Sequence, residues 1–247
     1  MFTSHTSFAR PAATLLLVAG LGVFSACQLE KLTPDQTLRP SDKTLVFEAS
    51  CEDEDGESKT ARDADGHFLW TPGDAISVFF GQGTDGGSRF EAQTEVPAAR
   101  TNFSGNIGVV EGGGEGDTEE DDYFWAVYPY DETVSCDGNS VTLTMLPYQT
   151  AGEAGTFAPG MAPAIARALG LKLAFKNVYS GFCFSVSEAG FTALTFRGNS
   201  GEQIAGLVKV GFDENGAPAV EEILDGVTEM TLKAPAGGFV PGAYYYL

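Results

Sequence analysis

The hydrophobic side chains of this chain recur at every second residue through most of its length after residue 44. In one run Val141, Leu143 and Met145 alternate with Thr142 and Thr144. Successive side chains of a β-strand point to opposite faces of the sheet, so this period indicates a half-buried strand. The same period recurs in LVFEAS (45–50), DAISVFF (74–80), YFWAVYPY (123–130), LKLAFKNV (171–178), GFCFSVS (181–187), ALTFRG (193–198), QIAGLVKVGF (203–212), MTLKA (230–234) and AYYYL (243–247).

A helical pattern is found in one short segment, AIARALG (164–170), which Pro163 precedes. Seven residues form one or two helical turns at most. Turn-forming sequences separate the strand-like runs, as in Asp137-Gly138-Asn139, Arg197-Gly198-Asn199 and Asn215-Gly216. Many short strands with turns between them and almost no helix predict an all-β fold of antiparallel sandwiches.

The length of 247 residues allows two domains of ordinary size. Residues 149–163 are poor in strand pattern and rich in proline and glycine, so they are the expected junction. This division predicts a first β-sandwich at 45–158 and a second at 159–247. The same stretch is also compatible with a long crossover loop inside one large sandwich. Because the chain stops in the strand-like PGAYYYL, the second sandwich is expected to be incomplete.

The N-terminus has the pattern of an export signal. An apolar run from Ala12 to Phe24 is shorter than the ~20 residues that a membrane-spanning helix needs, and it fits the core of a signal peptide. Ser25, Ala26 and Cys27 follow it and resemble the lipobox of bacterial lipoproteins. We therefore expect a signal peptide at 1–26, an acylated Cys27 and a polar tether at 27–44. The alternative is an ordinary secretory signal with a free or bridged cysteine.

The charge of the chain is strongly negative, with 34 acidic residues, 14 basic residues and a formal net charge of −20. Binding to phosphate backbones needs clustered lysine and arginine, so this composition excludes a nucleic-acid partner.

Motifs of catalysis and metal binding are absent from the sequence. It contains no GxSxG, HExxH or GxxxxGK[ST] pattern. His67 is the one candidate base, and a solvated side chain is the better interpretation of it. The acidic run at 52–56 does not fit the EF-hand spacing, and the run at 111–122 alternates acidic residues with glycine, as solvated loops do. We therefore expect no enzyme activity, no cofactor and no metal, and rank an acidic-residue hydrolase as a third hypothesis.

The remaining cysteines, Cys51, Cys136 and Cys183, show no CxxC spacing and allow at most one disulfide. Cys183 lies in a strand-like run, where we expect a buried free thiol.

Aromatic residues offer a second kind of candidate site. Trp70 and Trp125 stand in apolar alternation and are expected in the core, whereas Tyr128, Tyr130 and Tyr148 are candidates for stacking on sugar rings.

Several motifs follow one another in an order that resembles the fimbrillin-like lipoproteins of Bacteroidales. They are Trp70-Thr71-Pro72-Gly73-Asp74-Ala75-Ile76-Ser77-Val78, Phe103-Ser104-Gly105, Ala126-Val127-Tyr128-Pro129-Tyr130, Leu146-Pro147-Tyr148-Gln149-Thr150, Ala162-Pro163-Ala164 and Leu173-Ala174-Phe175-Lys176-Asn177. The resemblance implies tandem transthyretin-like sandwiches in a pilus subunit or pilus-associated adhesin. It also implies a lipid anchor in the outer membrane and exposure at the cell surface or on a fimbrium.

The resemblance further implies assembly by strand exchange. In polymerising members a protease cuts after an arginine and removes the first strand, and a strand of a neighbouring subunit fills the groove. Here residues 45–50 correspond to the removable strand and Arg62 to the cleavage site, unless the protein is an uncut anchor or tip subunit. The expected partners are other pilus subunits and a ligand on a host or bacterial surface. The second hypothesis is an outer-membrane accessory lipoprotein that binds carbohydrate.

Overall fold

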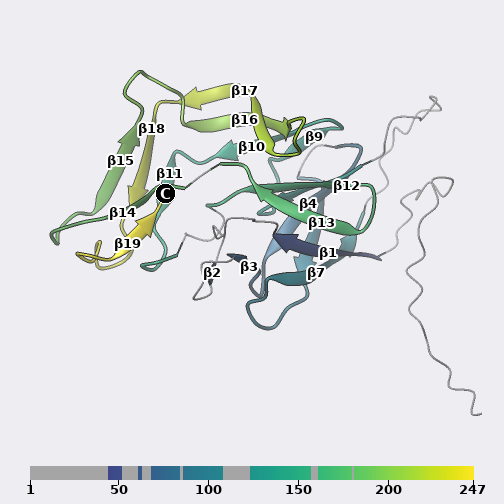
Figure 1. Cartoon of the computed structure of the whole chain (residues 1–247), viewed down its shortest axis with the longest axis horizontal. Helices are drawn as coiled ribbons and strands as arrows, with labels where there is room; N and C mark the ends of the chain where they lie inside the picture. The colour runs from purple at the N-terminus through teal and green to yellow at the C-terminus, as the bar shows by residue number, and fades with distance from the viewer. Residues whose placement is uncertain are drawn as a thin grey trace, which may run out of the picture. The chain divides into compact units, whose positions relative to one another are not determined.

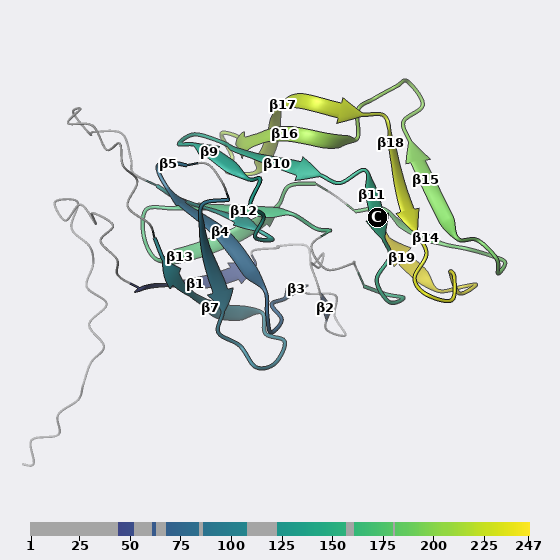
Figure 2. The same ribbon diagram turned by 180° about the vertical axis from the view of Figure 1, so that it is seen from behind.

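The computed structural model describes residues 44–51, 61–62, 68–83, 86–107, 123–156, 161–179 and 181–247. They all belong to one compact unit, residues 37–247. Within these described ranges the secondary structure is strand, with no helix (Figures 1 and 2). The prediction of an all-β protein is therefore confirmed.

The first layer is a closed sheet of seven strands. Its order is β1 (Thr44–Cys51), β13 (Lys172–Asn177), β12 (Ala164–Ala168), β8 (Phe124–Tyr128), β4 (Ala75–Phe80), β6 (Ser88–Ala92) and β7 (Arg100–Asn106), with β7 again beside β1. Every pair in it is antiparallel except β1 and β13, which are parallel.

The strands β4 and β8 are buried on both of their faces. In β8, Phe124, Ala126 and Tyr128 lie in the cluster of apolar side chains inside the closed sheet. Trp125 and Val127, which alternate with them, lie in a second cluster outside it. This explains why the sequence of β8 is almost continuously apolar, since a strand covered on both faces has no solvent-facing positions.

The second cluster is covered by a five-stranded sheet. Its order is β17 (Pro218–Val227), β16 (Ala205–Phe212), β10 (Val141–Met145), β9 (Ser135–Asp137) and β5 (Gln82–Gly83). Val141 and Leu143 of β10 share this cluster with Trp125 and Val127 of β8. The half-buried strand predicted from the alternation in 141–145 is therefore confirmed, and the structure adds that its apolar face packs on the closed sheet.

Smaller sheets enclose a third apolar cluster around Leu232 and Tyr245. They are β11 (Tyr148–Thr150), β18 (Glu229–Lys233) and β15 (Ala193–Arg197) in one sheet and β14 (Cys183–Ser185) with β19 (Tyr244–Tyr246) in another. A short pair, β2 (Ala61–Arg62) and β3 (Phe68–Leu69), follows β1 along the chain.

The prediction of a helix at 164–170 is wrong, because residues 164–168 form β12. This strand pairs over five residues with β8 and also pairs with β13. Ala164, Ile165 and Ala166 are fully buried. Backbone pairing on both sides and burial of these apolar side chains outweigh the weak helical propensity of a seven-residue segment.

The expected junction at 149–163 lies between strands that belong to one closed sheet. On its C-terminal side, β12 and β13 pair with β8 and β1, which precede it in the chain. The division into domains at residue 158 stays a prediction.

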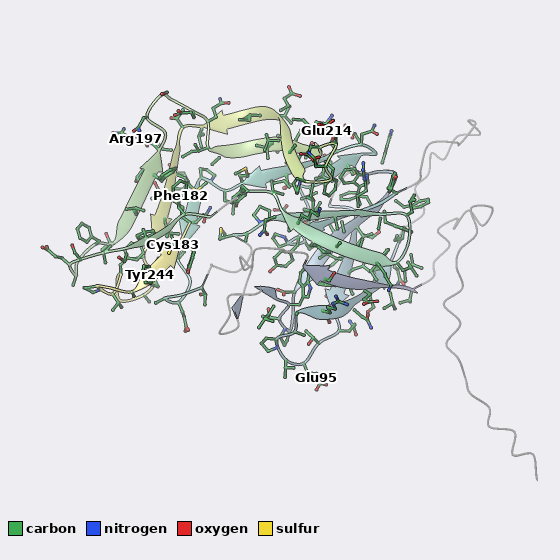
Figure 3. The ribbon with its side chains drawn as sticks, viewed as in Figure 1. Glu95, Phe182, Cys183, Arg197, Glu214 and Tyr244 are labelled. Atoms are coloured by element: carbon green, nitrogen blue, oxygen red, sulfur yellow. The ribbon has the colours of Figure 1, made fainter. Side chains whose placement is uncertain are left out.

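The prediction for Cys183 is also wrong. Its thiol is free but exposed, on β14 beside β19 (Figure 3), whereas Cys136 is free and buried. The two-stranded sheet leaves the odd-numbered side chains of β14 uncovered, so an apolar run does not become a buried strand there.

Candidate functional site

The removable strand that the resemblance implies at residues 45–50 lies in β1 of the closed sheet. β1 pairs with β7 in antiparallel register from Thr44–Asn106 to Ser50–Arg100. On its other edge it pairs with β13 in parallel register, from Glu48–Lys172 to Cys51–Phe175. Figure 1 shows β1 with β13 on one side and β7 on the other. β1 is therefore the strand that closes the sheet between β7 and β13.

The two edges of β1 are unequal. The ladder to β7 runs over seven residue pairs, and the ladder to β13 covers only the last four, beginning at Glu48. The backbone N–H of Glu48 donates to the carbonyl oxygen of Leu171 at 2.9 Å, just before β13. The antiparallel ladder with β7 thus sets the register of β1 from Thr44 to Ser50.

The inward side chains of β1 fill the interior of the closed sheet. Phe47 and Ala49 are fully buried, and Leu45 packs against the same cluster. The ring of Phe47 makes edge contacts with the rings of Phe90 and Phe124, at centroid distances of 5.3 and 5.0 Å. Full burial of such a side chain contributes about 2–3 kcal/mol, so these contacts are the main apolar anchor of β1.

The wall of this pocket depends on Gly105 of β7. A Cβ atom at this position would lie 2.5 Å from the carbonyl oxygen of Arg89 and 2.8 Å from Cγ of Phe90. Gly105 pairs with Phe90 on one side and with Leu45 of β1 on the other. The missing side chain therefore leaves the space in which the Phe90 ring reaches Phe47.

The outward side chains of β1 contribute little to the free energy that holds this strand in the sheet. Val46 is 45% exposed. Glu48 approaches Lys172 of β13 at 3.7 Å, and both side chains are exposed. An exposed ion pair contributes about 0–1 kcal/mol, so the inward row carries most of the side-chain contribution.

The motif residues around Trp70 and Tyr128 come together in space and have a structural role. The Trp70 ring makes edge contacts with the rings of Phe103, Tyr128 and Phe175 at 5.0–5.3 Å. The carboxylate of Asp74 accepts a hydrogen bond from the backbone N–H of Thr71 at 2.7 Å and one from the Tyr128 hydroxyl at 3.1 Å. These residues fix a turn and a core, which is a packing role.

Of the other predicted site residues, Arg62 lies at the end of β2 and pairs with Phe68 of β3. This places its backbone in a two-residue strand; its cleavage stays a prediction. Cys27 and His67 lie outside the described residues. Sequence reasoning missed Gly105 and Phe90 as pocket residues; Phe103-Ser104-Gly105 marked the segment but gave no sign of which strand it meets.

The candidate sugar-stacking residues separate clearly by exposure. Trp70 and Trp125 are 1% and 0% exposed, so the prediction that they belong to the core is confirmed. Tyr128 is buried as well, and Tyr130 is half-buried. Tyr148 is 78% exposed on β11, where it is the register partner of Thr231.

A polar network spans the outer sheet. Lys209 Nζ lies 2.7 Å from the carboxylate of Asp137 and 4.0 Å from that of Glu221, which accepts a hydrogen bond from the Ser140 hydroxyl at 2.7 Å. Desolvation acts to raise the pKa of Asp137, but hydrogen bonds from Lys209 and from backbone N–H groups outweigh it and lower that pKa. The hydrogen bond with Asp137 in turn raises the pKa of Lys209. The network ties β9, β16 and β17 together.

Reactive groups are sparse in the part of the chain that the structure describes. Burial raises the pKa of the Cys136 thiol to about 11. No group of three or more His, Cys, Asp or Glu side chains in the described ranges has the spacing to hold a metal ion. An open depression with a volume of about 390 Å³ lies beside Arg197 and Glu229, which form an exposed ion pair. Figure 3 labels Arg197.

No protein-family model, no curated protein and no solved structure matches the chain. Among the described residues, no helix has the length and apolar character to cross a membrane.

Proposed function

We propose that the protein is a fimbrillin-like cell-surface lipoprotein, a structural pilus subunit or pilus-associated adhesin that assembles by strand exchange. The position of β1 is the observation that supports this. It is a single strand at the start of the described chain, and it closes a sheet between two other strands. Its loss would leave an apolar groove with free backbone groups on both sides, which is the template for addition of a foreign strand.

Cys27 carries lipid and anchors the protein in the outer membrane, and the polar tether joins it to the folded part. Cleavage after Arg62 releases β1, because Arg62 follows β1 before the next strand of the closed sheet. The folded part consists of transthyretin-like sandwiches, the protein has no enzymatic activity, and its partners are other pilus subunits and a surface ligand.

The test is arginine-specific proteolysis of the mature chain without lipid, followed by gel electrophoresis in SDS without boiling. The proposal predicts cleavage after Arg62 and then a ladder of SDS-resistant oligomers. The Arg62→Ala variant is the matched control and stays monomeric under the same treatment. A clean cut after Arg62 that yields only monomers contradicts the proposal.

A second candidate is carbohydrate binding at the cell surface, which the exposure of Tyr148 favours. Its ring stands on the outward face of a small sheet, next to Thr231, whose hydroxyl lies 3.1 Å from that of Thr195. An exposed aromatic ring beside hydroxyl groups suits the apolar face and the polar edge of a sugar. Binding on a glycan array that is lost in Tyr148→Ala supports this candidate, and no signal on the array removes it.

A further inference from the structure

The pocket under β1 has a shape that restricts which strand can occupy it. Three inward positions of β1 face three positions of β7: Leu45 faces Gly105, Phe47 faces Phe103, and Ala49 faces Thr101. From its N-terminal end, β1 therefore places a medium, a large and a small side chain (Leu45, Phe47 and Ala49) in the interior of the closed sheet.

The middle position demands an aromatic ring. Phe47 contacts two rings edge to face, from β6 and from β8, and is inaccessible to solvent. A smaller side chain here leaves a cavity between Phe90 and Phe124. Edge-to-face pairs are also directional, so an aliphatic side chain of similar volume replaces the area but not the two ring contacts.

The third position demands a small side chain. Ala49 lies between β7 and β13, with Thr101 and Leu173 as its register partners, and all three residues are buried. Here both edges of β1 are paired, so the backbone has no freedom to move away from a larger group. A larger residue must displace core side chains.

We infer that the β1 groove selects its occupant by sequence, and that it takes an extended strand of another subunit with the order aliphatic–x–Phe–x–Ala. The strand runs antiparallel to β7 and parallel to β13, with its phenylalanine against Phe90 and Phe124. This inference rests on the strand exchange proposed above and adds which strand can enter. The alternate positions, represented by Val46 and Glu48, face outward and accept most residues.

The test uses the full mature chain after cleavage at Arg62 and fluorescein-labelled synthetic peptides with the sequence of β1, residues 44–51, carrying serine in place of Cys51. Exchange of the peptide for the resident strand is followed by fluorescence anisotropy. The expected result is binding of the parent peptide. The peptide with Phe47→Ala binds at least about 100-fold more weakly, and that with Ala49→Leu about 10- to 100-fold more weakly. The peptide with Val46→Ala is the control and binds within about threefold of the parent.

The outcomes separate this inference from the proposed function. Peptides that bind with this order of affinity support the selective groove even if the cleaved protein forms no ladder, which would count against the pilus role alone. A ladder together with equal binding of all four peptides overturns the inference and leaves strand exchange intact. Binding of none of the peptides also overturns it.

Discussion

Replacement of Gly105 by alanine tests the pocket wall that the structure assigns to this position. An added Cβ would lie 2.5 Å from a backbone carbonyl oxygen and 2.8 Å from the Phe90 ring. A backbone atom cannot rotate away as a flexible side chain does, so the sheet or the ring must shift. Overpacking of this kind costs about 1–3 kcal/mol, against which the lower chain entropy of alanine returns about 0.4–1 kcal/mol. We expect a net loss of about 1–2 kcal/mol.

The matched control is Gly170→Ala. Nothing lies within 4 Å of a Cβ at Gly170, and neither glycine adopts the left-handed backbone conformation that disfavours alanine. The control substitution is therefore expected to be neutral or to stabilise the protein by up to about 1 kcal/mol. The two variants differ in the space around the new methyl group and share the same chemical change.

The measurement is urea unfolding followed by tryptophan fluorescence, because Trp70 and Trp125 are both buried and report on loss of the core. With a slope of about 2 kcal/mol per molar urea, the midpoint of Gly105→Ala is expected to fall by about 0.5–1 M. The midpoint of Gly170→Ala is expected to stay level or rise. If both variants shift equally, the pocket wall is not where the structure places it.

Two further predictions concern titratable groups. At pH 8 the exposed thiol of Cys183 is expected to react rapidly with Ellman's reagent, whereas Cys136, whose pKa burial raises to about 11, reacts only on unfolding. Cys183→Ser should therefore remove one rapidly reacting thiol and Cys136→Ser none; the reverse pattern contradicts the burial assigned to Cys136. The lowered pKa of Asp137 beside Lys209 makes its ionised form stabilising above the unfolded-state pKa of about 3.9, and this contribution is lost as the pH falls through the folded-state value. Asp137→Asn is therefore expected to cost about 0.5 kcal/mol at pH 6 and progressively less below about pH 4 in urea titrations, and a cost that is unchanged at pH 3 contradicts this.

The sequence was most informative where a local pattern decides the structure. The alternation in 141–145 predicted a half-buried strand, and β10 has those bounds. The two predictions that are wrong, the helix at 164–170 and the buried thiol of Cys183, have one physical cause. In both, the structure depends on pairing between distant segments. AIARALG has a weak helical pattern that two neighbouring strands override, and Cys183 lies in an apolar run whose sheet has only two strands.

The candidate site could also be predicted only in part. The alternation in LVFEAS predicts a strand, but the strand's partners come from segments that no local pattern connects to it. β7 follows β1 after several elements, and β13 lies in the second half of the chain. The dependence of the Phe47 pocket on Gly105 arises only once β6, β7 and β1 lie side by side. It therefore has no signal in a single sequence.

A reversible disulfide between β1 and β7 tests the central claim, that β1 leaves the closed sheet. Val46 and Ser104 are directly opposite. Because the N–H of Glu48 points to β13, even-numbered residues of β1 turn their backbone groups away from β7, so this is a non-hydrogen-bonded pair with a Cα separation of about 4.5 Å, within disulfide range. The double variant Val46→Cys, Ser104→Cys is prepared in a Cys51→Ser, Cys183→Ser background. It is cleaved with the arginine-specific protease and then run in SDS before and after addition of dithiothreitol.

Monomers are expected while the disulfide holds β1 in place, and a ladder of SDS-resistant oligomers is expected once it is reduced. A ladder of equal intensity from the oxidised protein would show that oligomers form with β1 still in the sheet, which rules out assembly by exchange of β1.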